Sequence, residues 1–201
     1  MKNQPGRYLT CAVCVAVVLL LSALEPFSSQ WLEFNRNRID QGQWWRLLTC
    51  HWVHLSLLHA MGNIGGLALL AAITRRTVKG SVLVWLLLWC SGITGLGLIL
   101  LAADLQRYVG LSGVLHGVLM VAPFLASGYS RRVALLFAGL IVVKVLWEQT
   151  PFYSDQTIMV IIGGRVETRA HLLGVIAGGV WLLAMAVWSQ ISRRDSPYVS
   201  E

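Results

Sequence analysis

Charged residues are scarce in this chain. Lys, Arg, Asp and Glu make up 12% of its 201 residues, whereas 56% are hydrophobic. Soluble domains carry roughly 25% charged residues, so a water-soluble protein of this size could not bury so much apolar surface. The apolar residues also come in long runs of the kind that span a bilayer. The length suits one compact helical domain, residues 1–201.

Six apolar runs divide the chain. They cover residues 9–24, 52–73, 82–103, 112–126, 133–147 and 170–188. The fourth and fifth are short for a hydrocarbon layer about 30 Å thick, which surrounding helices would tolerate. The first follows Lys2 and Arg7 as in a signal peptide, but Glu25-Pro26-Phe27 is a poor cleavage site, so we expect an uncleaved helix. The runs predict an all-α membrane protein with six transmembrane helices.

Acidic residues are also few, and the net charge is +7. Basic and aromatic residues are not interleaved as in RNA-binding proteins, so we expect no nucleic-acid partner. One side of the six spans holds nine basic residues and two acids, and the other side holds seven of each, Lys144 and Glu148 among them. The nine are Lys2, Arg7, Arg75, Arg76, Lys79, Arg131, Arg132, Arg193 and Arg194. The positive-inside rule then places both termini in the cytoplasm.

Several chemistries lack the residues they need. The Cys11/Cys14 pair lies in an apolar run, where packing is expected and not redox or metal chemistry, and the four cysteines suggest no disulfide framework. The chain has no HExxH motif for a zinc protease and no pair of membrane aspartates for an aspartyl protease. We expect no metal and no other cofactor.

Polar residues within apolar runs are candidates for function, because burying them in a membrane is expensive. In the second run, His59, Gly62, Asn63 and Gly66 share one helical face. His and Asn can donate hydrogen bonds to a developing negative charge, and the glycines allow another helix to approach. An interhelical hydrogen-bonded pair that only joins two helices would use the same residues.

The fourth run opens with Gly110-Leu111-Ser112-Gly113, followed by His116 and Gly117. A serine at a helix start is exposed, and its backbone amide points toward any oxyanion. Gly113 and Gly117 form a small-residue face for close packing. A serine that caps the helix, with packing glycines beside it, would account for the same residues.

The sixth run opens with His171, which shares a face with Gly174 and Gly178. A neutral histidine is the natural proton acceptor for a serine hydroxyl. With both termini inside, the second, fourth and sixth runs all enter from the outer face. His59 and Asn63 are then one to three turns deep, near Ser112 and His171. No acid lies within the six runs, so these residues suggest a Ser-His dyad and not a triad.

The same motifs, in this order, resemble the rhomboid family of intramembrane serine proteases. The resemblance runs from Trp45-Arg46 through His54, His59 and Asn63 to Gly110-x-Ser112-Gly113 and Ala170-His171-x-x-Gly174. It covers most of the chain and is closest to the bacterial rhombosortase subgroup.

The resemblance implies Ser112 as nucleophile, His171 as general base, and His59, Asn63 and the Ser112 amide as the oxyanion site. It implies residues around the site at Gly110, Gly113 and His116, and a structural loop at Trp45-Arg46. His116 stands where many rhomboids carry a tyrosine that packs on the base, and Thr74 stands where the family carries an acid. Gly163-Gly164 would give flexibility, with no assigned role.

The implied substrates are single-span membrane proteins with a C-terminal Gly-Gly tail. The enzyme would lie in the bacterial inner membrane, with its site toward the periplasm. Two alternatives remain open. One is a catalytically inactive rhomboid-like protein that binds membrane helices. The other is a haem-binding cytochrome subunit that uses His116 and His171.

Overall fold

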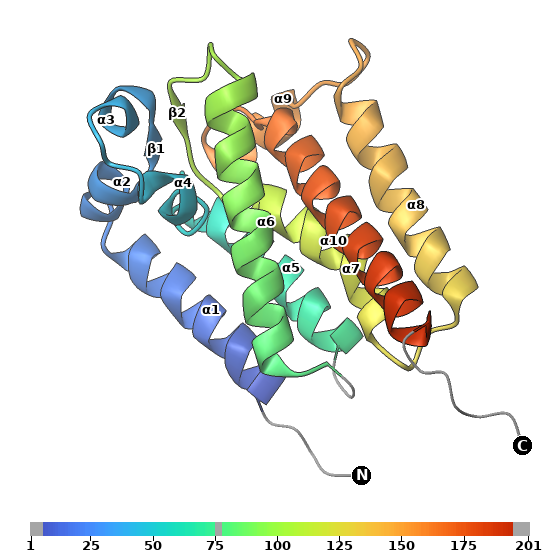
Figure 1. The fold of residues 1–201 in the computed structure, drawn as a ribbon. Helices are drawn as coiled ribbons and strands as arrows, with labels where there is room; N and C mark the ends of the chain where they lie inside the picture. The colour runs from blue at the N-terminus through green and yellow to red at the C-terminus, as the bar shows by residue number, and fades with distance from the viewer. Residues whose placement is uncertain (1–5, 75–77, 195–201) are drawn as a thin grey trace, which may run out of the picture.

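Helices dominate the computed structural model, which describes residues 6–74 and 78–194. Six longer helices correspond one to one to the six predicted runs. They are α1 (Gly6–Ala23), α5 (Leu57–Thr74), α6 (Gly80–Leu101), α7 (Ser112–Leu125), α8 (Arg131–Glu148) and α10 (Thr168–Arg194). In Figure 1, α1, α6 and α8 run upward while α5, α7 and α10 run downward. The starts of α5, α7 and α10 therefore point to the same side of the bundle.

Three helices are long and apolar enough to cross a membrane. These are Leu57–Thr74, Gly80–Leu101 and Thr168–Ser192, and the stretches Tyr8–Ala23 and Ser112–Leu125 are apolar but shorter. Helix α8 differs because Arg131, Arg132, Lys144 and Glu148 interrupt its apolar sequence. The protein is a helical membrane bundle, and the count of six spans remains a prediction.

The second helix begins later than its apolar run. The run was expected to be helical from residue 52, but residues 51–56 form turns and α5 begins at Leu57. A ring nitrogen of His51 lies 3.1 Å from the Ser91 carbonyl oxygen, and the Cys50 carbonyl accepts a hydrogen bond from Gly110 N–H at 3.0 Å. Hydropathy does not distinguish such a buried turn from a helix. His59 therefore lies in the first turn of α5 and Asn63 in the second.

The segment between α1 and α5 folds into short elements beside the bundle (Figure 1). They are α2 (Phe27–Leu32), β1 (Phe34–Asn35), α3 (Arg36–Asp40) and α4 (Arg46–Thr49). Strand β1 pairs antiparallel with β2 (Arg107–Tyr108), with Phe34 opposite Tyr108 and Asn35 opposite Arg107. This ladder is an addition to the predicted all-α fold, and two residues are too few to give a strand periodicity in the sequence.

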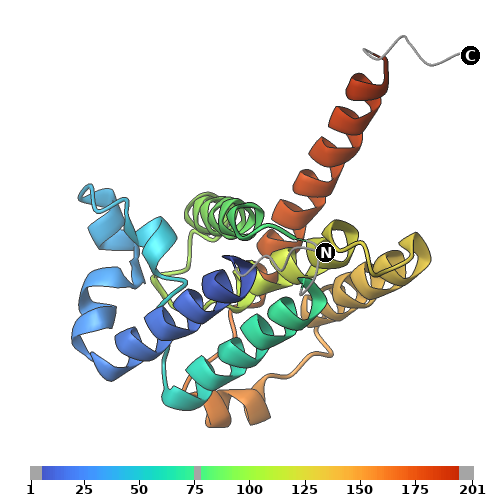
Figure 2. The same ribbon diagram turned by 90° about the horizontal axis from the view of Figure 1, so that it is seen from below.

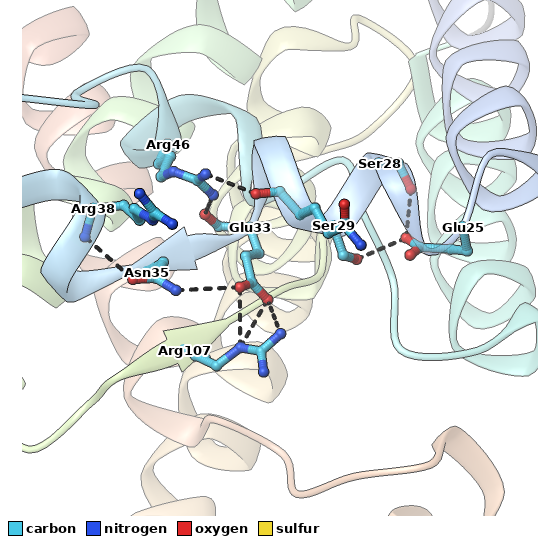
Figure 3. A network of polar contacts seen from close by, with 9 residues as sticks. Glu25, Ser28, Ser29, Glu33, Asn35, Arg38, Arg46 and Arg107 are labelled. Carbon is cyan, nitrogen blue, oxygen red and sulfur yellow. Dashed lines mark hydrogen bonds and ion pairs between the residues drawn. The ribbon is translucent and has the colours of Figure 1, made fainter.

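Arginine contacts hold that segment together (Figure 3). The Arg46 guanidinium donates to the carbonyl oxygens of Glu33 and Gln30 at 2.9 and 2.8 Å. The Glu33 carboxylate in turn accepts from Arg107 at 2.8 Å, which joins β1 to β2. The indole N–H of Trp45 donates to the Trp31 carbonyl at 3.1 Å. These contacts agree with the structural role expected for Trp45-Arg46.

Helices α7 and α10 pack backbone against backbone. A Cβ added at Gly113 would lie 2.7 Å from the Ala170 carbonyl oxygen, and one added at Gly178 would lie 2.7 Å from that of Gly117. A Cβ at Gly174 would overlap the Gly113 carbonyl. The small-residue faces predicted on both helices are therefore confirmed as one contact surface, which we call the glycine seam.

The rest of the core is apolar. Leu67 and Leu70 of α5, Leu86 of α6 and Val118 of α7 are fully buried in it. All four cysteines are buried, as their apolar surroundings predicted. Thr74 is buried as well, and its hydroxyl donates to the Leu70 carbonyl at 2.7 Å.

The charge asymmetry is only partly visible in the described residues. Lys2, Arg75 and Arg76 lie outside them, as do the side chains of Arg7, Arg193 and Arg194. Lys79 precedes α6, and Arg131 and Arg132 open α8, so these three lie at the lower end of the bundle in Figure 1. The orientation of the termini remains a prediction.

Candidate active site

Ser112 is the first residue of α7, and the loop before it is held from both sides. The Tyr108 hydroxyl donates to the Gly110 carbonyl at 2.6 Å, and Gly110 N–H donates to Cys50. Gly110 has a φ of +121°, a conformation that favours glycine. Figure 1 shows that α7 begins below the upper ends of α6 and α10. The first backbone N–H groups of α7 have no acceptor within the helix, so they are available to a ligand at the helix start beside Ser112.

His171 lies in the first turn of α10, with 5% of its surface exposed. Its Nε2 is 2.9 Å from Ser112 Oγ, although 59 residues separate the two in the sequence. The glycine seam is what makes this approach possible, because Gly113 follows the serine and packs on Ala170, which precedes the histidine. The structure thus brings together the two residues that the sequence singled out.

An acid completes the hydrogen bonding of His171. Its Nδ1 lies 2.8 Å from Glu148 Oε2. The sequence predicted a serine and a histidine without an acid, and that expectation is wrong as a description of the site. The fifth run was taken to end at Trp147, whereas α8 continues to Glu148. The carboxylate therefore reaches α10 from the last turn of α8.

His116 and Lys144 lie around this group. The His116 ring stacks on the His171 ring, with centroids 4.2 Å apart and planes at 27°. His116 Nδ1 is 2.7 Å from the Ser112 carbonyl oxygen, and its Nε2 is 2.7 Å from Lys144 Nζ. Lys144 Nζ is also 2.7 Å from Glu148 Oε1. The five side chains form a continuous polar cluster, which we call the Ser112 cluster: Ser112, His116, Lys144, Glu148 and His171.

His59 and Asn63 face the same space from α5. A Cβ at Gly110 would lie 2.8 Å from His59 Cε1, so the His59 ring packs beside the loop that leads to Ser112. The Asn63 side-chain amide donates to the His59 carbonyl at 3.1 Å. The predicted shared face is confirmed, because His59, Gly62, Asn63 and Gly66 all line one cavity with Ser112.

That cavity has a volume of about 1270 Å³. Besides the polar residues it is lined by apolar side chains of α7 and α8, among them Leu115, Leu119, Phe137, Leu140 and Ile141. Ser112, His171 and the side chains of His59 and Asn63 thus open onto a space whose remaining walls are largely apolar. Such a space suits an apolar peptide segment better than a polar metabolite.

The short helix α9 (Gln156–Ile162) covers one side of the cavity. It ends at Gly163, whose φ of +84° closes the helix. A Cβ at Gly164 would lie 2.7 Å from Leu55 Cδ1. The two glycines therefore let this loop turn and pack on the residues before α5, which the sequence did not reveal.

Two cofactor chemistries can be compared with this geometry. His116, Glu148 and His171 offer three ligand atoms within 4.8 Å of one another, but the Lys144 ammonium contacts two of these residues and supplies a positive charge there. For a haem, each histidine would present a ring nitrogen to the iron. Instead the two rings stack on each other, with His171 Nε2 at Ser112 and His116 Nε2 at Lys144.

Sequence reasoning missed Lys144 and Glu148 as parts of the site. Both were only counted in the charge balance of the outer side. A signal was present, because Lys144 interrupts an apolar run and Glu148 follows it by four residues on the same helical face. Tyr108 was also missed, and nothing in its sequence surroundings pointed to the Gly110 contact.

Comparisons with known proteins agree with these motifs. The family model of the rhomboid domain matches residues 41–188. The chain is 26% identical over 192 residues to the rhomboid protease GlpG of Yersinia enterocolitica. The aligned region covers 94% of this chain and 64% of that protein. The chain is 27% identical to the protein of the same name in Yersinia pestis, with the same coverage. The chain is 25% identical over 188 residues to the rhomboid protease GlpG of Serratia proteamaculans.

The chain thus spans less than two thirds of the length of these curated relatives. The match nonetheless runs from the loop before α4 to the last part of α10, and it includes Ser112, His171, His59 and Asn63. The chain belongs to the rhomboid family.

Proposed function

We propose that this protein is an intramembrane serine protease in which Ser112 is the nucleophile and His171 the general base. The observation that carries the proposal is the 2.9 Å contact between Ser112 Oγ and His171 Nε2 beside a largely apolar cavity. Membership of a family whose similar members are named rhomboid proteases supports the same reaction.

The reaction follows from these positions. Ser112 Oγ attacks the scissile carbonyl carbon while its proton passes to His171 Nε2. The tetrahedral intermediate then collapses, the C–N bond breaks, and the same proton goes to the departing amine. A water molecule, deprotonated by His171, hydrolyses the acyl-enzyme and releases Ser112.

The oxyanion formed in both steps needs donors. The Ser112 amide lies at the N-terminus of α7, where the helix dipole also favours negative charge. His59 and Asn63 line the cavity next to it and carry the N–H groups that would reach the oxyanion. Asn63 donates to the His59 carbonyl here and retains a second N–H for the substrate.

The proposed substrates are single-span membrane proteins with a C-terminal Gly-Gly tail, cut near the outer face by a rhombosortase-like enzyme. Glycines before a membrane helix would destabilise helical structure there and let the backbone adopt the conformation that the site requires. The charge distribution of the loops supports six spans, both termini in the cytoplasm and a periplasmic site in a bacterial inner membrane. The apolar lining of the cavity supports a membrane segment as ligand.

The test is cleavage of a single-span substrate with a Gly-Gly tail by the purified protein in lipid vesicles. Ser112→Ala and His171→Ala should each abolish cleavage, and a fluorophosphonate probe should label the unmodified protein but not Ser112→Ala. Ser189→Ala is the matched control, because Ser189 is exposed on α10 and bonds only within its own helix.

Two results would contradict the proposal. Undiminished cleavage by Ser112→Ala would remove the serine from the mechanism. Binding of the substrate without cleavage and without probe labelling would favour the inactive helix-binding protein, in which the same cavity holds a membrane segment.

A further inference from the structure

We propose that Glu148 is a positioning residue that holds His171 in the reactive tautomer, so that Ser112, His171 and Glu148 work as a triad. This inference rests on the proposed function of Ser112 and His171. It goes beyond the two-residue mechanism that the sequence suggested, and it assigns roles to Lys144 and His116 as well.

The hydrogen bonds of His171 leave one consistent assignment. A carboxylate only accepts, so Nδ1 of His171, at 2.8 Å from Glu148 Oε2, carries the proton. Nε2 then has its lone pair directed at Ser112 Oγ, 2.9 Å away. This is the tautomer that can take the serine proton. Without an acceptor at Nδ1, nothing in the Ser112 cluster would select it.

Glu148 is held in the ionised form that this role needs. Its side chain is 4% exposed, and an unpaired buried carboxylate would be costly. Each of its oxygens has its own donor, Oε1 from Lys144 at 2.7 Å and Oε2 from His171 at 2.8 Å. The Lys144 side chain is 49% exposed, and its ammonium places a positive charge against the buried carboxylate.

His116 also has a defined set of hydrogen bonds, and its ring stacks on that of His171. Its Nδ1 donates to the Ser112 carbonyl at 2.7 Å, because a carbonyl cannot donate. Its Nε2 therefore accepts from Lys144, at 2.7 Å. Lys144 is thus fixed by two acceptors, His116 and Glu148, and the stacked His116 ring limits rotation of His171. The ring N–H groups of His116 and His171 and two of the three N–H groups of Lys144 thus have matching acceptors in the Ser112 cluster.

The carboxylate also matters while the reaction proceeds. When Nε2 takes the serine proton, the His171 ring becomes a cation. Glu148 lies against the opposite nitrogen and stabilises that cation in a buried setting. The proton on Nδ1 stays on the ring, so the carboxylate neither gains nor loses one in the balanced step.

Glu148→Gln is the decisive variant. The amide keeps the size of the side chain, but its NH₂ group can donate to Nδ1 and stabilise the unreactive tautomer. We expect kcat to fall by about 10²- to 10⁴-fold, as for loss of a triad acid, and KM to change by less than about threefold. The rate of fluorophosphonate labelling at Ser112 should fall with kcat, because labelling needs the activated serine and no substrate contact. Asp40→Asn, at an exposed acid of α3, is the charge-matched control.

Conservative variants separate positioning from a purely structural role. Glu148→Asp keeps the charge but shortens the side chain. Its kcat should therefore be at least about tenfold higher than that of Glu148→Gln. A purely structural role predicts the reverse, because the isosteric amide would then be tolerated better than the shorter acid. If Glu148→Gln is not recovered folded, Glu148→Asp and Lys144→Gln carry the test, both with reduced kcat and labelling at unchanged melting temperature.

The outcomes distinguish this inference from the function beneath it. Wild-type kcat and labelling in Glu148→Gln, with Ser112→Ala inactive, would overturn the triad and leave the protease intact. Cleavage by Ser112→Ala would overturn the proposed function itself. If Glu148→Gln and Glu148→Asp lowered the melting temperature by the same amount and kcat by the same factor, Glu148 would serve to pack α8 against α10 and not to position His171.

Discussion

The two sides of Ser112 are built by different means. On one side the glycine seam joins α7 to α10 through backbone contacts that leave no room for a methyl group. On the other side α8 reaches the site through Lys144 and Glu148, while most of its surface is exposed. Figure 2 shows the C-terminal part of α10 extending away from the other helices, α8 among them. The seam fixes where the reacting groups lie, and the polar side fixes their protonation.

The largest effect is expected where the seam is tightest. A Cβ at Gly174 would overlap the Gly113 carbonyl, which is backbone and cannot rotate away. Gly174→Ala should therefore lower the free energy of unfolding by about 3 kcal/mol or more, at the upper end of overpacking effects. It should also separate Ser112 from His171 and remove probe labelling. Thermal unfolding in detergent measures the first effect.

The matched control for that substitution lies on α8. Nothing lies within 4 Å of a Cβ at Gly139, so Gly139→Ala should be neutral or stabilise the helix by about 0.5–1 kcal/mol. If both alanines changed the melting temperature equally, the contrast between the seam and α8 would not hold.

The second-largest effect on stability and activity is expected in the loop that leads to Ser112. Gly110 has a φ of +121°, and a Cβ there would lie 2.8 Å from the His59 ring. Gly110→Ala should cost about 1–3 kcal/mol of stability through backbone strain. It should also lower kcat at least tenfold by displacing an oxyanion donor. Measuring kcat and unfolding on the same preparation separates the two, and an unchanged kcat would exclude His59 from the oxyanion site.

These positions show which features of the fold and of the site could be predicted from the sequence. The six helices, the glycine faces and the pairing of Ser112 with His171 followed from hydropathy, periodicity and motif order. The start of α5 did not, because the apolar residues before Leu57 are buried in turns and give the same hydropathy as a helix. Glu148 did not either, because its partner lies 23 residues away on another helix. Contacts between helices depend on rotation and depth, which a single run does not encode.

A smaller effect is expected at His116. The ring stacks on His171 and also binds the Ser112 carbonyl and Lys144. His116→Ala should lower kcat about tenfold by releasing the His171 ring, a change of roughly 1.4 kcal/mol in the barrier. His116→Tyr keeps an aromatic ring in place and should retain most of the activity. An alanine variant as active as the tyrosine variant would show that the stack does not position the base.

The smallest effect is expected for an ion pair that resembles Lys144–Glu148 in distance but not in burial. Asp104 bonds Arg169 at 2.6 Å, yet its side chain is 75% exposed. The hydrogen bond from Arg169 lowers the pKa of the Asp104 carboxyl below its usual value. A folded-state pKa below the unfolded one stabilises the fold at neutral pH, and this contribution is lost as the pH falls through the folded pKa.

Water and salt screen such an exposed pair, so Asp104→Asn should leave the melting temperature unchanged within about 1 °C at pH 7 and 0.15 M salt. The comparison with wild type is made at pH 7 and then at decreasing pH, where any small difference should vanish as the pH falls through the lowered pKa of Asp104. A large destabilisation at pH 7 that persisted in 1 M salt would mean that the pair is effectively buried. Burial would then not be what separates Asp104 from Glu148, and the special role of Glu148 would have to come from His171 alone.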